Sequence, residues 1–381
     1  FKRLFINCQI VIMLIMVFYG MIERNVFAFE NQTEDDLYEM YNWLIENQLS
    51  DGALPMYLAK DGDASIVPYF SSIATLAIIE YSQKEESLET VENYYDWYFD
   101  HLNTDDDGPA GSIYDYKAEI KDKIVISKES KADYDSADSY AALFLMSLES
   151  YVKAGGDKDY IILHGNEIDT IINLILSLID QDGLCRVSEA NHTKYLMDNC
   201  EVAAGLNSAA GILSKVYLKE YSVFSKEFWN TARRIIDLRK TRKALLAAIE
   251  SKMWNEDRQV YEIGIDKHGD ILEYDIEYDF YPDAVAQIFP IVFGVISPQS
   301  QRSKQLYEDF SDKYKWEELE HYKIGDSSFY WGITAYCGAI MSDSEKVSKY
   351  ISSFVSEAAP EYRYPAYNAD IAWVVLAGIY N

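Results

Sequence analysis

Apolar residues recur with the 3.6-residue period of an α-helix over nearly the whole chain, and no segment beyond the first 30 residues shows a sustained alternation of period two. In the segment Leu88–Leu102, for example, Val91, Tyr94 and Tyr98 share one face, and acidic residues lie between them. Such a pattern predicts an amphipathic surface helix. The stretch AALFLMSL at residues 141–148 is apolar on nearly all sides, which predicts a helix covered on more than one side.

These two kinds of helix alternate along the chain. Segments with one polar face are predicted at Thr33–Leu49, Leu88–Leu102, Asn166–Ile179, Lys226–Trp254, Gln299–Tyr314 and Ser344–Ala358. More apolar segments are predicted at Tyr69–Tyr81, Asp135–Lys153, Cys200–Leu218, Pro282–Ile296, Ser328–Met341 and Ala369–Tyr380. The alternation predicts an all-α fold, the (α/α)6 toroid, in which six helical hairpins close an inner ring inside an outer ring. We expect residues 29–381 to form one such domain, although two stacked helical domains would give a similar pattern.

The links between the predicted helices are unequal. Links from an inner helix to the next outer helix are short, whereas those from an outer to an inner helix are long: Ser50–Pro68, Asn103–Tyr134, Asp180–Asn199, Asn255–Tyr281 and Lys315–Ser327. The long loops therefore gather at the end of the ring where the inner helices begin. Sites tend to be built from such loops on a rigid scaffold, so we expect the functional site at this end.

Two turns and one helix start resemble those of known glycosidases. The turns QLSDGALP at residues 48–55 and DQDGL at residues 180–184 resemble the turns that join hairpins in the six-hairpin glycosidase superfamily. The stretch YDSADSYA at residues 134–141 resembles an inner-helix start of glycoside hydrolase family eight. The resemblance implies a toroid that hydrolyses glycosidic bonds. The chain departs from that family at residues 67–72, VPYFSS, where the family carries its general-acid Glu.

Glycoside hydrolysis needs one carboxylic acid that protonates the leaving oxygen and one carboxylate that activates water or attacks carbon. Candidate carboxyl groups lie at the starts of several inner helices: Asp135, Asp138, Asp198, Glu201, Asp283, Asp326 and Asp370. Each one taken singly also suits the N-terminus of a helix, where a carboxylate accepts free backbone N–H groups. The prediction of an active site therefore depends on the whole set.

We assign roles to four of these carboxyl groups. Asp283 is the predicted general acid, because Pro282 and several aromatic residues flank it and desolvation would raise its pKa. Asp138 or Glu201 is the predicted base that activates water. Asp135 would orient the sugar through hydrogen bonds.

Aromatic residues are concentrated in the same loops and first helical turns. Flat amphipathic rings pack on the C–H faces of a pyranose, and Tyr hydroxyls bond its edges. The predicted substrate-binding residues are Tyr69, Tyr134, Asp198, Tyr281, Tyr330, Trp331, Tyr367 and Asp370. Since the chain has 32 Tyr, many of these rings will instead belong to the core.

The net charge of −29 excludes nucleic acid as a partner, because a phosphate backbone would be repelled over most of the surface. The predicted partner is a carbohydrate substrate, and we expect a monomer. A uronic-acid polymer stays open as substrate if Arg186, Lys194, Arg258, Lys267 and Arg363 form a local basic patch.

We expect no metal and no cofactor. The five His residues are scattered without a metal-binding spacing, and no nucleotide-binding fingerprint is present. Asp105–Gly108 resembles part of a calcium loop, but Tyr116 stands where the loop's bidentate Glu belongs.

The N-terminal segment predicts export. Lys2 and Arg3 precede an apolar run at Leu4–Ile22, and Val26 and Ala28 provide the small residues of a cleavage site. We therefore expect residues 1–28 to be a signal peptide of a secreted bacterial protein. The alternative is an uncleaved transmembrane anchor that holds the protein at the cell surface, the one membrane contact that we expect.

Two other functions stay open. A polysaccharide lyase on the same toroid would use Tyr or His as base and need a cation beside the uronate. A non-catalytic glycan-binding protein would bind sugar without releasing reducing ends.

Overall fold

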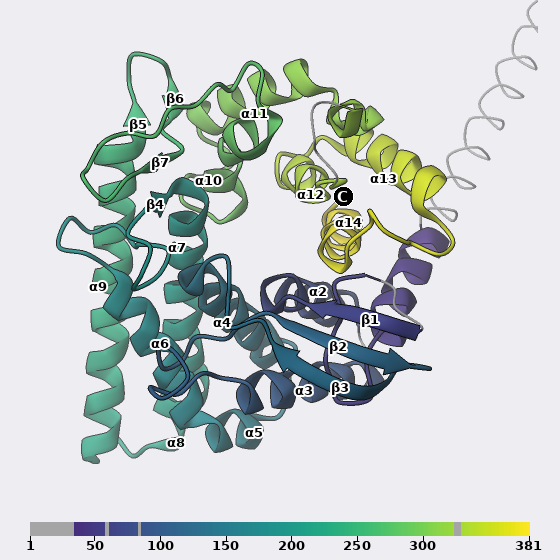
Figure 1. The fold of residues 1–381 in the computed structure, drawn as a ribbon. Helices are drawn as coiled ribbons and strands as arrows, with labels where there is room; N and C mark the ends of the chain where they lie inside the picture. Colours follow the sequence, from purple (N-terminus) through teal and green to yellow (C-terminus); the bar gives the residue numbers. More distant parts are fainter. Residues whose placement is uncertain (1–33, 58–60, 83–84, 324–328) are drawn as a thin grey trace, which may run out of the picture.

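The computed structural model describes residues 34–57, 61–82, 85–323 and 329–381 (Figure 1). The predicted signal segment and Asp326 lie outside these residues. Within them, no helix combines the length and the apolar character that a membrane span requires.

The helices form two concentric rings, as Figure 1 shows. The outer ring consists of residues 34–46, α3 (Glu85–Asp100), α6 (Gly165–Leu178), α9 (Lys226–Met253), α11 (Gln301–Tyr314) and α13 (Ser344–Ala358). The inner ring consists of α2 (Pro68–Tyr81), α4 (Ala137–Lys153), α7 (Leu196–Ile212), α10 (Phe289–Val292), α12 (Ile333–Ile340) and α14 (Asn368–Tyr380). Each inner helix packs against the next, and α14 packs against α2. The ring is therefore closed, and the predicted all-α toroid is confirmed.

The fourth inner helix is the one that departs most from its predicted range, Pro282–Ile296. It is broken into a π-helical turn, η2 (Phe280–Ala284), and the four-residue α10. Pro290 has no backbone N–H to donate, so it is tolerated only in the first turn of a new helix. Gly294 then adopts a positive φ of 66°, which ends α10.

Short elements complete the chain. A three-stranded antiparallel sheet has the order β1 (Asp61–Ile66), β2 (Tyr116–Lys121) and β3 (Ile124–Ser130). The two-stranded pairs are β4 (Lys194–Tyr195) with β7 (Gly264–Ile265), and β5 (Trp254–Asn255) with β6 (Val260–Tyr261). The remaining helical pieces are α5 (Lys158–Leu163), η1 (Leu213–Tyr217), α8 (Leu218–Glu220), η3 (Trp316–Glu318) and η4 (Glu320–Lys323).

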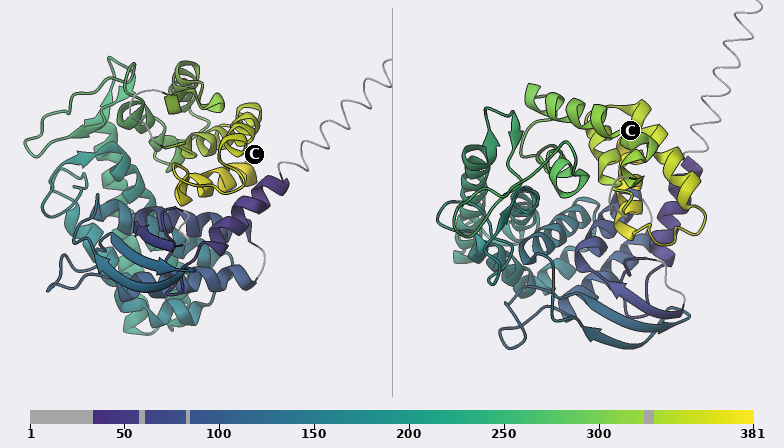
Figure 2. Two further views of the ribbon diagram at one scale, coloured as in Figure 1. Left: turned by 45° about the vertical axis from the view of Figure 1, so that its right-hand side comes forward. Right: turned by 45° about the horizontal axis from the view of Figure 1, so that its top comes forward.

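The three-stranded sheet was not predicted from the sequence. It forms within the long links that precede α2 and α4, and Figure 2 shows it lying beside this part of the ring. Tyr116 of β2 packs edge-on against Trp97 of α3, with ring centroids 5.5 Å apart. The sheet thus fixes a long link on the rigid ring, at the end where the inner helices begin.

The two turns that resemble each other in sequence also have the same local structure. Gly52 and Gly183 both have φ near +90° (92° and 88°), a conformation that disfavours other residues. In each turn the preceding Asp accepts a hydrogen bond from the backbone N–H two residues later, Asp51 from Ala53 and Asp182 from Leu184. The repeated motif therefore marks two equivalent outer-to-inner corners.

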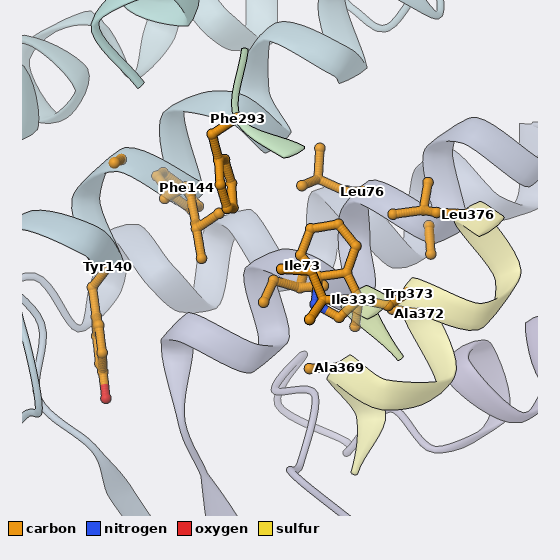
Figure 3. Close-up of a cluster of buried hydrophobic side chains, with 14 of the residues drawn as sticks. Ile73, Leu76, Tyr140, Phe144, Phe293, Ile333, Ala369, Ala372, Trp373 and Leu376 are labelled. Carbon is orange, nitrogen blue, oxygen red and sulfur yellow. The ribbon is translucent and has the colours of Figure 1, made fainter. Parts of the chain in front are cut away.

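The centre of the ring is filled with apolar side chains from different inner helices. Figure 3 shows Ile73, Phe144, Ile333 and Trp373 among them. Helices α4 and α7 approach closely because Gly205 has no side chain: a Cβ there would lie 2.7 Å from the Cα of Ala142. This packed core forms a rigid floor for the cavity above it.

Candidate active site

A cavity of about 320 Å³ lies at the end of the ring where the inner helices begin. Its floor includes the core residues Ile73, Ile333 and Trp373. The other polar and aromatic residues that line it include Tyr69, Phe70, Asp115, Asp135, Ser136, Tyr140, Asp198, Glu201, Tyr281, Phe329, Trp331, Tyr367 and Asp370. Five carboxyl groups from distant parts of the sequence therefore converge on one hollow.

The start of α7 is held in place by the links on both sides of it. The Leu196 N–H donates to the Ile263 carbonyl over 2.9 Å. The Asn199 side chain accepts from the Cys185 N–H and donates to the carbonyls of Cys185 and Tyr195. Asp198 and Glu201 are three residues apart, so this anchored helix turns both carboxyl groups toward the cavity.

Glu201 is a carboxyl group poised to exchange a proton near neutral pH. It is 1% exposed, and its Oε1 accepts the Tyr69 hydroxyl over 2.6 Å. Burial raises its pKa to about 7, although the neighbouring Ser139 hydroxyl and the hydrogen bond from Tyr69 favour the ionised form. Tyr69, at the first inner-helix start, thus contacts a carboxyl group of the third inner helix.

Asp138 and Asp198 lie close to Glu201, and burial raises the pKa of both. Negative charge on the neighbouring carboxyl groups raises both pKa values further. Asp198 lines the cavity, but Asp138 does not. Asp138 is fully buried, and its Oδ1 accepts the Ser139 N–H over 2.9 Å. The structure therefore places Asp138 next to the cavity carboxyl groups but outside the lining of the cavity.

Asp115 is a cavity carboxylate that was not predicted from the sequence. It directly precedes β2, and its backbone bonds with Asp133 and Lys131 tie it to the strand end. Its Oδ1 accepts the Tyr140 hydroxyl over 3.0 Å, and Lys131 Nζ lies 4.0 Å from Oδ2. Burial raises the pKa of Asp115 to about 6, against the lowering effect of Tyr140 and Lys131. The short alternation YKAEIK after Asp115 is the one signal that could have placed it.

Two further predicted carboxylates line the cavity in different environments. Asp135 is exposed toward solvent, and partial desolvation together with the charge of Asp133 raises its pKa. Asp370 is buried and accepts the backbone N–H groups of Tyr330 and Gly332. Burial raises the Asp370 pKa to about 6, although these N–H groups favour the charged form. Asp370 therefore fixes the turn that precedes α12.

Asp283, the predicted general acid, does not reach the cavity. It lies in the broken turn η2, is 5% exposed, and its Oδ2 accepts the Asp275 N–H over 2.6 Å. Burial does raise its pKa, in the predicted direction. The prediction assumed a continuous fourth inner helix, and the break turns this carboxyl group onto the preceding loop.

Like the carboxyl groups, some of the predicted aromatic residues line the cavity and others do not. Phe70 stacks on Tyr367 with ring centroids 5.9 Å apart, and both line the cavity. Tyr281, which is 49% exposed, packs on Trp331 with centroids 4.4 Å apart. These rings give the hollow an apolar wall and a partly exposed aromatic edge.

Two predicted substrate-binding rings do not line the cavity. Tyr330 is 5% exposed and packs edge-on against Phe354. Tyr134 stacks on Tyr114 outside the lining, with centroids 5.4 Å apart.

The described lining of the cavity contains no Lys, Arg or His. Two residues of the predicted basic patch are engaged elsewhere, since Arg186 pairs with Asp180, and Lys194 pairs with Asp180 and Asp182. Among the described residues, no three His, Cys, Asp or Glu side chains are grouped so that they could hold a metal ion. The described lining therefore presents carboxyl groups and aromatic rings without a cationic side chain.

No protein-family sequence model matches this chain, and no curated protein resembles it in sequence. Solved structures do share its fold. A wild-type glycosidase is 10% identical with a TM-score of 0.57, over 92% of this chain and 96% of that one. An α-amylase from Clostridium perfringens is 11% identical with a TM-score of 0.57, over 91% and 97%. A cellobiose 2-epimerase from Bacillus thermoamylovorans B4167 is 9% identical with a TM-score of 0.53, over 92% and 99%. The predicted resemblance to the six-hairpin toroid is confirmed at the level of fold.

Proposed function

We propose that this protein is a glycoside hydrolase that cleaves a neutral oligosaccharide or polysaccharide in the cavity at the centre of the ring. The observation that carries the proposal is the convergence of five carboxyl groups and several aromatic rings on that cavity. Glycoside hydrolysis uses a protonated and an ionised carboxyl group together. The same fold can host different activities, so the proposed activity depends on the residues of the site.

In the proposed mechanism Glu201 is the general acid. With a pKa of about 7 it keeps a proton on a large fraction of molecules at neutral pH. It donates this proton to the glycosidic oxygen as the bond from that oxygen to the anomeric carbon breaks. Tyr69 donates its hydroxyl hydrogen to Oε1 and so holds the carboxyl group in one orientation.

Asp115 is the proposed general base. With a pKa of about 6 it is mostly ionised at neutral pH, and the Tyr140 hydroxyl holds it in place. A water molecule forms the new bond to the anomeric carbon and transfers its proton to Asp115. Asp135 and Asp198 then bind sugar hydroxyls at the cavity, while Asp370 keeps the Trp331 turn in place.

The proposed substrate is neutral because the described lining carries no cation. The negative charge of the cavity carboxyl groups would repel a uronate. A lyase also needs a cation that neutralises the uronate, and the described lining has none. This observation disfavours the lyase alternative. Rings such as Tyr281 and Trp331 suit the C–H faces of neutral pyranoses.

A panel of neutral and uronate-containing glycans tests the proposal. We expect new reducing ends from at least one neutral glycan and no products that absorb in the near ultraviolet. Absorbing products from a uronate would establish a lyase instead. Binding without any new reducing ends would establish a non-catalytic glycan-binding protein.

We also propose that the protein acts outside the cell. The support is the apolar run Leu4–Ile22 followed by the small residues Val26 and Ala28. N-terminal sequencing of the protein recovered from the culture medium should begin at Phe29. Recovery of the full chain in the membrane fraction would instead indicate an uncleaved anchor.

A further inference from the structure

Helix α9 carries a concentration of positive charge that the rest of the chain lacks. Its residues 226–243 include seven basic and two acidic side chains, a net charge of 7 − 2 = +5, in a protein whose net charge is −29. The basic residues are Lys226, Arg233, Arg234, Arg239, Lys240, Arg242 and Lys243. Figure 1 shows α9 along the outer edge of the ring. Helix α9 therefore places a net positive charge at the outer edge of an acidic molecule.

Exposed apolar and basic residues alternate along one stripe of α9. Trp229, Arg233, Ile236, Lys240 and Lys243 follow each other at intervals of four, three, four and three residues, which places them on a single helix face. All five are exposed, Trp229 by 61% and Ile236 by 51%. We call these five residues the α9 stripe.

The apolar character continues into the loop before α9. Phe224 is 95% exposed and Val223 is 53% exposed. The opposite side of α9 packs on the ring through the buried residues Ile235, Leu238 and Leu245. The exposed rings are therefore additional to the apolar face that the fold requires.

The basic residues of the α9 stripe are free to meet an external partner. Among the described residues, Arg233, Lys240 and Lys243 have no ion-pair partner. Arg234 and Arg242 point elsewhere: Arg234 pairs with Asp169, and Arg242 donates to the Ala203 carbonyl. The acidic residues on this part of the helix are Glu227 and Asp237.

From this arrangement we infer that the α9 stripe docks the protein on an anionic lipid surface. Trp229 and Ile236 enter the headgroup region, and Arg233, Lys240 and Lys243 contact lipid phosphates. A basic amphipathic helix with Trp on its exposed face is the pattern of helices that lie in a membrane interface. A soluble polyanion would leave the two exposed apolar side chains without a role.

A second copy of the chain fits this face poorly. A symmetric dimer through the α9 stripe would bring two clusters of like charge together. The overall negative charge does not prevent lipid docking, because charges farther away than a Debye length of about 8 Å are largely screened at physiological salt. Docking through the outer ring also leaves the cavity accessible, since the cavity lies among the inner helices.

Vesicle co-sedimentation of the full chain tests this inference. We expect binding to vesicles of phosphatidylglycerol and phosphatidylcholine in equal parts, and much weaker binding to phosphatidylcholine alone. The triple variant Arg233→Gln, Lys240→Gln, Lys243→Gln should lose roughly 100-fold in affinity for the anionic vesicles. The matched control, Lys121→Gln, Lys267→Gln, Lys304→Gln, removes three exposed charges elsewhere and should bind like the wild type.

A second pair of variants tests the apolar part of the α9 stripe. Trp229→Ser with Ile236→Ser should weaken vesicle binding at least about tenfold, whereas Ile124→Ser with Ile126→Ser, two equally exposed residues of β3, should not. Far-ultraviolet circular dichroism checks that each variant is folded.

Three outcomes would overturn the inference. The first is a lack of charge dependence: the wild type binds both kinds of vesicle equally, or the triple variant binds anionic vesicles as well as the wild type does. The second is binding to dextran sulfate without binding to vesicles. The third is a dimer in sedimentation velocity that the Trp229→Ser, Ile236→Ser variant abolishes.

Discussion

The third and fourth inner helices begin with carboxyl groups that look equivalent in sequence and differ in the structure. Glu201 and Asp283 are both nearly inaccessible to solvent, and burial raises the pKa of each. Glu201 follows an anchored helix start and faces the cavity. Asp283 lies in a broken turn and accepts a backbone N–H of the preceding loop. Burial at a helix start therefore does not by itself bring a carboxyl group to the cavity; the helix must also direct it into the hollow.

The largest expected effect is a difference in kcat between a Glu201 variant and an Asp283 variant. Glu201→Gln keeps the shape of the side chain and removes the exchangeable proton, so kcat on the hydrolysed glycan should fall by roughly 10³-fold. Asp283→Asn is the matched control and should keep kcat within about threefold of the wild type. A reversed pattern, with Asp283→Asn inactive and Glu201→Gln active, would return the general-acid role to Asp283.

The next effect concerns stability. Asp370→Ala leaves the N–H groups of Tyr330 and Gly332 without their buried acceptor, and should lower the free energy of unfolding by about 2–4 kcal/mol. The exposed control Asp279→Ala should change it by less than about 0.5 kcal/mol. Urea unfolding of the two variants measures both values. Equal stability of Asp370→Ala and the wild type would mean that Asp370 does not hold this turn.

A smaller effect sharpens the role of Tyr69. In the wild type, kcat/KM should rise with pH through about 6 as Asp115 ionises and fall through about 7 as Glu201 loses its proton. The Tyr69 hydroxyl lowers the Glu201 pKa, so Tyr69→Phe should move the alkaline limb to higher pH. We expect kcat to fall by roughly three- to tenfold. An unchanged alkaline limb would exclude Glu201 as the group that titrates there.

The smallest effect concerns the acidic limb of the kcat/KM profile, which we assign to Asp115. Lys131 lies 4.0 Å from Asp115, and its charge lowers the Asp115 pKa. Lys131→Gln should therefore move the acidic limb of kcat/KM upward, by at most about half a pH unit because the pair is partly exposed. The alkaline limb should stay in place. Movement of both limbs would show that Asp115 and Glu201 do not titrate separately.

The ring of helices could be predicted from sequence because its signal is repeated. The 3.6-residue period marks each outer helix, and apolar runs such as residues 141–148 mark the inner helices. The fourth inner helix was predicted as continuous because its run VAQIFPIVFGVI is apolar nearly throughout, although Pro290 and Gly294 interrupt it. Helical periodicity therefore identified which segments are helical, but not where one is broken.

The site could be predicted only in part. The place of Asp135, Asp198, Glu201 and Asp370 in the cavity lining could be expected, because helix starts gather at one end of a toroid. Asp115 was missed because a strand of six residues, with two of its side chains buried, gives too short an alternation to stand out. Which carboxyl groups face the hollow depends on packing between segments far apart in the chain, as the Tyr69–Glu201 contact shows.

The proposed roles of Glu201 and Asp115 are best tested by a crystal structure of the Glu201→Gln variant with a bound neutral oligosaccharide. We expect a glycosidic oxygen about 3 Å from the residue 201 side chain, with Asp115 on the far side of the same bond. An oligosaccharide bound away from the cavity, or one whose glycosidic oxygens all lie beyond hydrogen-bond reach of residue 201, would contradict these roles.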